Sequence, residues 1–202
     1  MKTIYFVRHG QTDYNKQHII QGSGVDSSIN EKGQQQAQAF FNYYQNVPID
    51  KIFVSKLKRT QQTVQPFIDK GIPFEATADI NEISWGIHEG KKAAPWMRAS
   101  YKKLIAAWQN GNFEASLENG ESAKALATRL TAFINHIRQI EAQTILVCTH
   151  GRALRCLMCL LKGEHLREME KYKHSNTGLF LVKYDGQRFM VELENDVRHF
   201  SQ

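Results

Sequence analysis

The stretch Thr3-Ile4-Tyr5-Phe6-Val7-Arg8-His9-Gly10 places a short apolar run directly before a charged Arg-His-Gly. The run is rich in β-branched and aromatic residues without clear alternation, which is typical of a strand covered by helices on both faces. A second apolar run, Ile145 to Cys148, ends in Thr149-His150-Gly151. We therefore predict a parallel sheet in which two strands each deliver a histidine followed by a glycine.

A third apolar run, Ile52 to Val54, is followed shortly by Arg59. In an open α/β sheet the ligand crevice lies outside the carboxyl ends of the parallel strands, so residues far apart in sequence meet there. We expect this arginine and the two histidine-bearing strand ends to lie together. Arginine and histidine in that arrangement favour binding of a phosphate and attack on it.

The remainder of the chain alternates between helix and strand patterns. Asn30 is the predicted N-cap of the first long helix. Helical spacing predicts helices over about 31–44, from Arg59 onward, and over 93–109, 121–141 and 153–161. Residues 73–76 resemble a short edge strand, and 179–183 and 189–193 alternate around Asp185-Gly186, which indicates a hairpin. The predicted fold is α/β: a three-layer sandwich with a mostly parallel central sheet, an antiparallel edge and flanking helices.

Length and composition agree with this architecture. The 202 residues, 42% of them hydrophobic, can bury one sizeable core, and we expect a single domain over residues 1–202. The segment at about 91–119 interrupts the strand and helix rhythm beside the candidate site, which predicts an insertion or lid. No apolar stretch approaches the roughly 20 residues of a membrane span, and no signal-peptide core is present, so we predict a cytoplasmic protein with no membrane partner.

Three cysteines, Cys148, Cys156 and Cys159, lie in apolar surroundings. Their odd number makes a disulfide framework a poor explanation. Cys156 and Cys159 form a Cys-x-x-Cys, but inside an apolar helical run. We therefore predict buried small hydrophobic residues and not a redox or zinc pair.

The net charge of +6 raises the question of nucleic-acid binding. The basic residues are scattered in short clusters, and no stacking-aromatic signature such as an RNA-recognition motif accompanies them. A modest positive field suits a small anionic substrate at least as well. The predicted partner is a small phosphorylated metabolite and not nucleic acid, and the sequence leaves a homodimer open.

The segment from Phe6 to Asn15, Phe-Val-Arg-His-Gly-Gln-Thr-Asp-Tyr-Asn, resembles the signature of the histidine phosphatase superfamily, which includes cofactor-dependent phosphoglycerate mutases and many phosphatases. Order and spacing make the resemblance specific, because it spans roughly residues 3–180. It implies a phosphoglycerate mutase-like fold. The later motifs that resemble the family are Ser55-x-x-x-Arg59-Thr60-x-x-Thr63, Glu82-x-x-x-Gly86-x-x-x-Gly90, Gly120-Glu121-Ser122 and Thr149-His150-Gly151.

Phosphoryl chemistry assigns roles that agree with this resemblance. A transferring phosphoryl group needs cationic donors around its oxygens and a nucleophile in line with the leaving oxygen. His9 is the candidate nucleophile, which would form a phosphohistidine. Arg8 and Arg59 would clamp the oxygens through their planar donor forks, and His150 would supply a further donor. The surrounding cations should keep His9 neutral, so that its lone pair is available.

Glu82 is the candidate general acid, which would protonate the leaving alcohol and then activate the hydrolytic water. That first duty requires the carboxyl group to hold a proton, which burial favours. The resemblance implies that Asn15 contacts the phosphate and that Gln21 and Gly22 lie in a loop near the substrate. No metal or other cofactor is required, because the arginines supply the positive charge.

Each assignment has an alternative. His9 and His150 with Glu82 would suit a transition metal, although adjacent arginines would repel a cation. A mutase would use the same phosphohistidine, but mutases of the family resemble one another in an arginine-rich, proline-containing stretch that is not matched over 91–103. We therefore predict hydrolysis of a small phosphate monoester. The alternatives are a cofactor-dependent phosphoglycerate mutase and a non-catalytic phospho-ligand binding protein.

Several residues near these motifs receive weaker interpretations. Five basic residues of the predicted lid could read a second anionic group of the substrate: Lys91, Lys92, Arg98, Lys102 and Lys103. Trp85 and Trp96 flank this region and could shape a pocket. His88, His165 and His174 are expected to be ordinary surface or partly buried residues. Asn176 is expected to support the second histidine-bearing strand.

Overall fold

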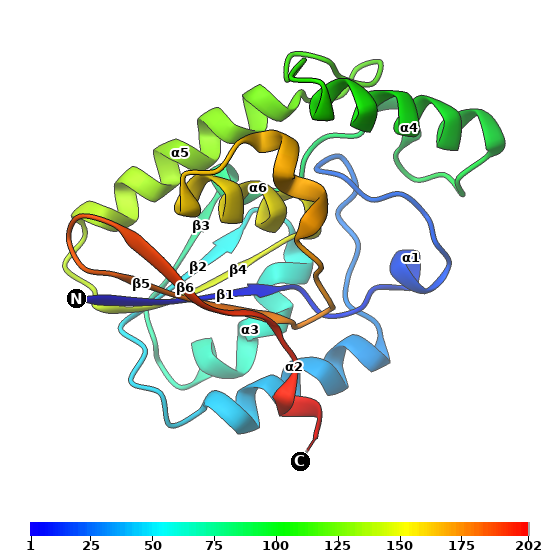
Figure 1. Cartoon of the computed structure of the whole chain (residues 1–202). Helices are drawn as coiled ribbons and strands as arrows, with labels where there is room; N and C mark the ends of the chain where they lie inside the picture. The colour runs from blue at the N-terminus through cyan, green and yellow to red at the C-terminus, as the bar shows by residue number, and fades with distance from the viewer. Residues whose placement is uncertain (202) are drawn as a thin grey trace.

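Six strands form one sheet in the computed structural model, which describes residues 1–201 (Figure 1). Their spatial order is β3-β2-β4-β1-β5-β6. The first four run parallel, and β5 is antiparallel to both of its neighbours, β1 and β6. The predicted mostly parallel sheet with an antiparallel edge is confirmed. The strands are β1 (Lys2–Arg8), β2 (Lys51–Ser55), β3 (Phe74–Thr77), β4 (Thr144–Thr149), β5 (Leu179–Tyr184) and β6 (Phe189–Asp196).

Helices cover both faces of this sheet, which confirms the three-layer sandwich. In Figure 1, α2 (Glu31–Tyr44) and α3 (Lys58–Asp69) lie below the sheet, and α5 (Ala123–Gln139) and α6 (Gly151–Lys162) lie above it. The four-residue α1 (Asp13–Lys16) follows β1. Within the segment predicted as an insertion or lid, α4 (Pro95–Gln109) lies on the same side as α5 and α6.

The strands have apolar residues on both faces because each face has its own core. Ile145 and Val147 of β4 belong to the core beneath α5 and α6. Leu146 and Cys148 belong to the core that packs on α2 and α3. This two-sided burial explains why the sequence shows no polar alternation in the central strands.

Local capping sets the helix boundaries. The Asn30 side chain accepts a hydrogen bond from Gly33 N at 2.9 Å and so starts α2, as predicted. The long helix expected over 121–141 is shorter, because Ser122 is its N-cap and accepts from Ala125 N at 3.2 Å. The edge strand expected over 73–76 is Phe74–Thr77, which begins and ends one residue later in the sequence.

The three cysteines are buried and their thiols are free, as the sequence indicated. Among residues 1–201 the structure contains no helix with the length and apolar character needed to cross a membrane.

Candidate active site

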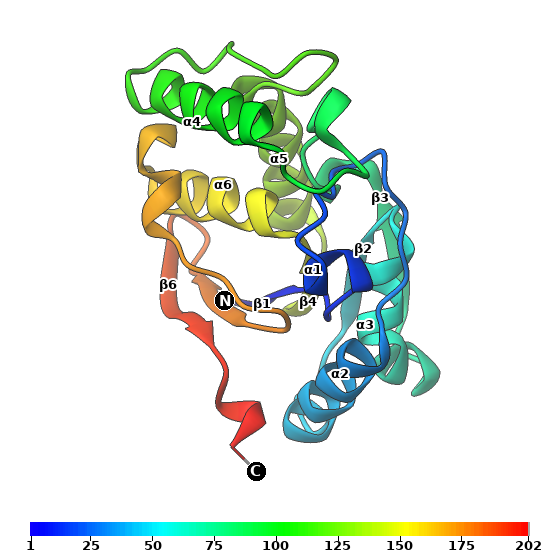
Figure 2. The same cartoon turned by 90° about the vertical axis from the view of Figure 1, so that its right-hand side faces the viewer.

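The two histidine-bearing strand ends lie side by side at one edge of the sheet. Arg8 and Thr149 are register partners in the parallel pair of β1 and β4. The His9 amide donates to the Thr149 carbonyl at 3.0 Å, which carries the pairing one residue past the strands. The centroids of the His9 and His150 rings are 5.1 Å apart. Figure 2 views the molecule from this side, with α1 between the two helical layers.

His9 is held so that one ring nitrogen is fixed and the other is free. Its Nδ1 lies 2.7 Å from the Gly10 carbonyl, which can only accept, so Nδ1 carries the proton and Nε2 the lone pair. Within residues 1–201, Nε2 has no hydrogen-bond partner. The backbone is fixed as well, because Gly10 N donates to Thr63 Oγ1 at 2.9 Å. The arrangement presents an unprotonated nitrogen from a buried ring.

Arg59 and His150 form a hydrogen-bonded pair. Arg59 lies in the first turn of α3, fully buried, and its Nε donates to His150 Nδ1 at 3.2 Å. Since that nitrogen accepts, His150 Nε2 carries the proton and donates to Ser55 Oγ at 2.8 Å. The Arg59 fork also donates to the carbonyls of Val25 and Gly22, at 2.6 and 3.3 Å. Both ring nitrogens of His150 are therefore engaged by protein groups.

Arg8 is a partly buried cation without a partner. Its side chain makes no hydrogen bond or ion pair to any other residue in 1–201, and its Nε is shielded from water. Burial, opposed by Glu82 and assisted by the charges of Arg59 and Arg155, lowers the pKa of Arg8 to about 10, so the guanidinium stays charged at neutral pH. An unpaired guanidinium that is partly removed from water is stabilised when an anion binds to it.

The same cations keep both imidazoles neutral. Burial first, and then the charges of Arg59 and Arg8, hold the pKa of His9 well below its ordinary value of 6.5. Burial, Arg59 and His9 lower the pKa of His150 in the same direction. We call Arg8, His9, Arg59 and His150 the basic cluster. It combines two positive charges with two neutral rings, which suits a bound anion facing a nucleophile.

Glu82 lies beside this cluster and is only 8% exposed. Its carboxylate accepts from the backbone amides of Arg152 and Ala153 at the start of α6, each at 3.1 Å. The Ile83 amide donates to it as well, at 3.0 Å. These three donors fix the position of the carboxyl group beside the start of α6.

The three further residues implied by the family resemblance lie in α1 and in the loop after it. Asn15 belongs to α1 and completes the capping box of Thr12, since its Oδ1 accepts from Thr12 N at 3.1 Å. The Gln21 side chain donates to Thr12 Oγ1 at 2.7 Å and so is bound to the β1–α1 loop. A Cβ on Gly22 would lie 2.6 Å from the Ile83 carbonyl, so this position requires glycine where its own carbonyl meets Arg59.

A small cavity of about 180 Å³ borders the cluster at Arg8. Several of the residues that line it were not predicted from the sequence to belong to the site. His174, expected to be an ordinary residue, lines it with Arg8 and Glu82. Burial and the charges of Arg8, Arg155 and Arg152 lower the pKa of His174 to about 3. The full lining is Arg8, Glu82, Trp85, Tyr101, Gly151, Arg152, Arg155 and His174.

Arg152 and Arg155 come from the first turns of α6 and share Glu170. Each donates to that carboxylate, Arg155 at 2.5 Å. Arg152, 5% exposed, also donates to the Tyr101 hydroxyl of α4 at 2.5 Å. Their spacing of three residues directly after the second His-Gly was a usable sequence signal, because it places both on one helix face. His174 had no such signal.

Two further expectations change. Asn176 does not support the second histidine-bearing strand: its Nδ2 donates to the His9 carbonyl at 2.9 Å, so it supports the first. The reason is that the loop before β5, the antiparallel neighbour of β1, passes over the end of β1. His88 is 2% exposed and lies 3.1 Å from Ser100 Oγ.

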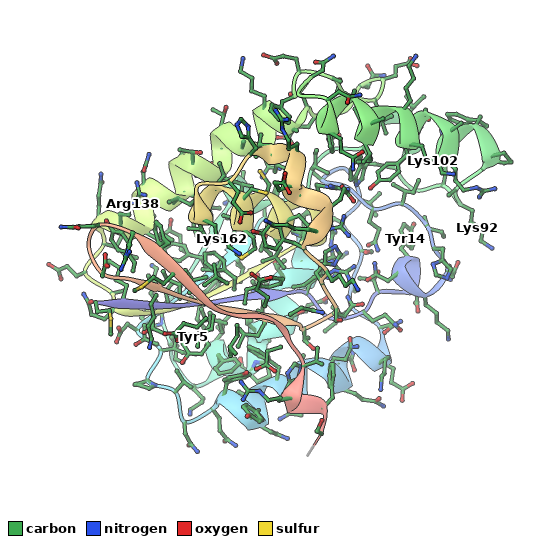
Figure 3. All side chains as sticks on the ribbon, viewed as in Figure 1. Tyr5, Tyr14, Lys92, Lys102, Arg138 and Lys162 are labelled. Carbon is green, nitrogen blue, oxygen red and sulfur yellow. The ribbon has the colours of Figure 1, made fainter. Side chains whose placement is uncertain are left out.

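Three basic residues of the segment 91–103 line two different cavities. Arg98 and Lys102 line a cavity that also contains Trp85, whereas Lys103 lines one on the other side of α4. Trp96 is 53% exposed and belongs to neither cavity lining. Figure 3 shows Lys92 and Lys102 at the end of the molecule that carries Tyr14, and Arg138 and Lys162 away from it.

The metal alternative finds no support in the donor arrangement. Over the described range 1–201, no three His, Cys, Asp or Glu side chains are grouped as metal ligands, and His9, His150 and Glu82 do not form such a set. The arginines between them instead favour an anion.

Comparison with known proteins places this site in a class. The sequence model of the histidine phosphatase superfamily, branch 1, matches residues 4–197, and the chain belongs to this superfamily. The chain is therefore an enzyme of the histidine phosphatase type.

Individual relatives are similar over nearly the whole chain. A protein of Hydrogenobacter thermophilus, provisionally named phosphoserine phosphatase 2, is 27% identical over 203 residues, which cover 100% of this chain and 99% of the relative. A probable phosphoglycerate mutase, GpmB, of an Enterobacter species is 27% identical, covering 98% and 95%. The solved structure of YhfR from Bacillus stearothermophilus has a TM-score of 0.84 at 26% identity, covering 98% and 99%.

Proposed function

We propose that this protein is a metal-independent phosphatase that hydrolyses a small phosphate monoester through a phosphohistidine on His9. One observation carries the proposal: the free Nε2 of a neutral, buried His9 lies in a cluster with the partly buried Arg8 and the buried Arg59, neither of which has an acidic partner. A phosphoryl group supplies the missing negative charge and the electrophile together.

In the first step the phosphoryl oxygens bind the guanidinium groups of Arg8 and Arg59, and His9 Nε2 attacks phosphorus. The bond from phosphorus to the alcohol oxygen breaks, and Glu82 gives that oxygen a proton. The ring gains positive charge as the new bond forms, and the Gly10 carbonyl, which accepts from Nδ1, stabilises it.

In the second step Glu82 takes a proton from water, the water oxygen attacks phosphorus, and the bond to His9 Nε2 breaks. Inorganic phosphate leaves and the neutral imidazole is restored. The three backbone amides that hold the Glu82 carboxylate keep this base aimed at one place in both steps.

His150 has two parts in this proposal. Its Nδ1 accepts from Arg59 Nε and so orients the guanidinium fork. Its Nε2 proton points at Ser55 Oγ, so direct donation to a phosphoryl oxygen requires the ring to exchange Ser55 for the substrate. Asn15 of α1 and Gly22 of the loop after it would support the substrate, together with Gln21, which lines a cavity beside α4.

Phosphate release from a panel of monoesters, without added metal, tests the proposal. The His9→Ala variant should lose about a thousandfold or more in turnover, because the nucleophile is gone. The exposed His165→Ala variant is the control and should retain full activity. Rapid acid-free quenching of the wild type with labelled substrate should trap label that is stable to base and labile to acid, as a phosphohistidine is. Full activity in His9→Ala would overturn the proposal.

A phosphoglycerate mutase is the second candidate function, because the GpmB relatives are named as probable phosphoglycerate mutases. Phosphoglycerate isomerisation, assayed in parallel, separates the two: isomerisation without phosphate release would establish a mutase. A correctly folded protein that binds inorganic phosphate but is inactive in both assays would instead be a phospho-ligand binding protein.

A further inference from the structure

A second and larger cavity, of about 520 Å³, adjoins the small cavity beside the basic cluster. We call it the α4 cavity. It shares Trp85 and Tyr101 with the small cavity, so the two cavities meet at these two rings. Its lining comprises Ile20, Gln21, Trp85, His88, Ala93, Met97, Arg98, Tyr101 and Lys102.

The walls nearest the shared boundary are apolar and firmly held. Trp85 and Met97 are 9% and 2% exposed. The Trp85 ring lies 5.5 Å from the Tyr101 ring and 6.3 Å from that of Trp108, centroid to centroid. Arg152 lies over the Trp85 ring at 5.6 Å while it donates to the Tyr101 hydroxyl. The two aromatic walls are therefore fixed before any ligand arrives.

The polar groups of the same lining are largely used by the protein. His88 is bound to Ser100, and the Arg98 guanidinium donates to the Ala93 carbonyl. The Gln21 side chain is bound to Thr12 and accepts from Ser27 Oγ at 2.5 Å. What remains for a ligand near the cluster is mainly apolar surface.

The size of the space argues in the same direction. Ligand sites of about 300–1,000 Å³ enclose molecules with one or more rings. The alcohol part of a two- or three-carbon phosphate would reach only the small cavity and leave the apolar α4 cavity in contact with water. That exposure carries a free-energy cost which a ring-sized apolar group would remove.

We propose that the α4 cavity binds the alcohol part of the substrate, and that the preferred substrates are phosphate monoesters whose alcohol carries a ring-sized apolar group. The proposal rests on the phosphatase function argued above. It identifies Trp85, Met97 and Tyr101 as walls that select the substrate while the basic cluster performs the chemistry.

A matched pair of substrates tests this selection: 3-phenylpropyl phosphate and propyl phosphate. Both release a primary alcohol of nearly equal intrinsic reactivity, so a difference in kcat/KM reports binding of the phenyl ring. The wild type should favour the phenyl compound by about tenfold to a hundredfold, as expected for burial of one aromatic ring.

Filling the cavity should remove the preference. Ala93→Phe places a ring in the space from its rim, and should lower kcat/KM for 3-phenylpropyl phosphate about tenfold while propyl phosphate changes little. Ala107→Phe is the matched control, because Ala107 lines the cavity on the other side of α4. Inhibition by inorganic phosphate should be equal in all three proteins, which shows that fold and basic cluster are intact.

The outcomes separate this inference from the function beneath it. Equal kcat/KM for the two substrates in an active, His9-dependent enzyme would overturn the apolar selection and leave the phosphatase standing. Equal losses on both substrates in Ala93→Phe with unchanged phosphate inhibition would also overturn it. No hydrolysis of either compound, or of any monoester, would instead remove the proposed function.

Discussion

The basic cluster and the α4 cavity are neighbours that are built in opposite ways. In the cluster, polar groups converge from the ends of β1 and β4 and from α3; all are buried except the partly buried Arg8, and Arg59 and His150 hydrogen-bond to each other. In the α4 cavity, the walls near the cluster are apolar, and the polar groups other than Lys102 are mostly bound to protein partners. The difference indicates that chemistry and substrate choice occupy separate parts of this fold, so each can be changed without the other.

The largest effect should follow a change within the cluster. Arg59→Lys keeps the charge but loses the planar fork that contacts His150 and two carbonyls. We expect kcat/KM to fall by about a thousandfold for every monoester alike, including both members of the phenylpropyl pair, because the lost donors act on the phosphoryl group. Steady-state kinetics on two substrates with different alcohols measures this.

The neighbouring Lys58 gives the control. It is exposed and contacts Asp26 only through its backbone amide, at 2.8 Å, so Lys58→Gln should retain activity. A loss in Arg59→Lys that is confined to substrates with bulky alcohols would contradict the separation of chemistry from selection.

An intermediate effect concerns stability at low pH. Burial and three arginine charges lower the pKa of His174 to about 3, from 6.5 for a free histidine. Between those values the unfolded chain binds a proton that the folded chain does not, so the stabilising contribution is complete above 6.5 and is lost as the pH falls. From about pH 8 to about pH 5, His174 alone should remove about 2 kcal/mol from the free energy of unfolding.

Urea unfolding at a series of pH values measures this, with His174→Gln expected to flatten the profile by that amount. His165→Gln, at an exposed position, should leave the profile unchanged. A His174→Gln profile parallel to that of the wild type would show that the imidazole is not shielded by the arginines of α6.

The two regions also differ in how far the sequence predicts them. The positions of Arg8, His9 and His150 in the site were predictable because apolar runs in the sequence indicate the strands, and the carboxyl ends of parallel strands lie at one edge of the sheet. Arg59 followed from a position at the start of a helix after a third strand. His174 and Tyr101 were not predictable, since they reach the site from a loop and from α4, whose packing depends on Arg152 and Glu170. Asn176 was assigned to the wrong strand because β5 returns beside β1 and not beside β4.

The smallest effect tests the rim of the α4 cavity, where two adjacent lysines face different ways. Lys102 lines the cavity and Lys103 lines the opposite side of α4. For a phenylpropyl phosphate that carries a carboxylate on its ring, Lys102→Gln should raise KM about threefold, because an exposed ion pair is worth less than about 1 kcal/mol. Lys103→Gln should not, and added salt should erase the difference. Equal changes in both variants would mean that the positive field of the whole helix, and not one side chain at the cavity, attracts the substrate.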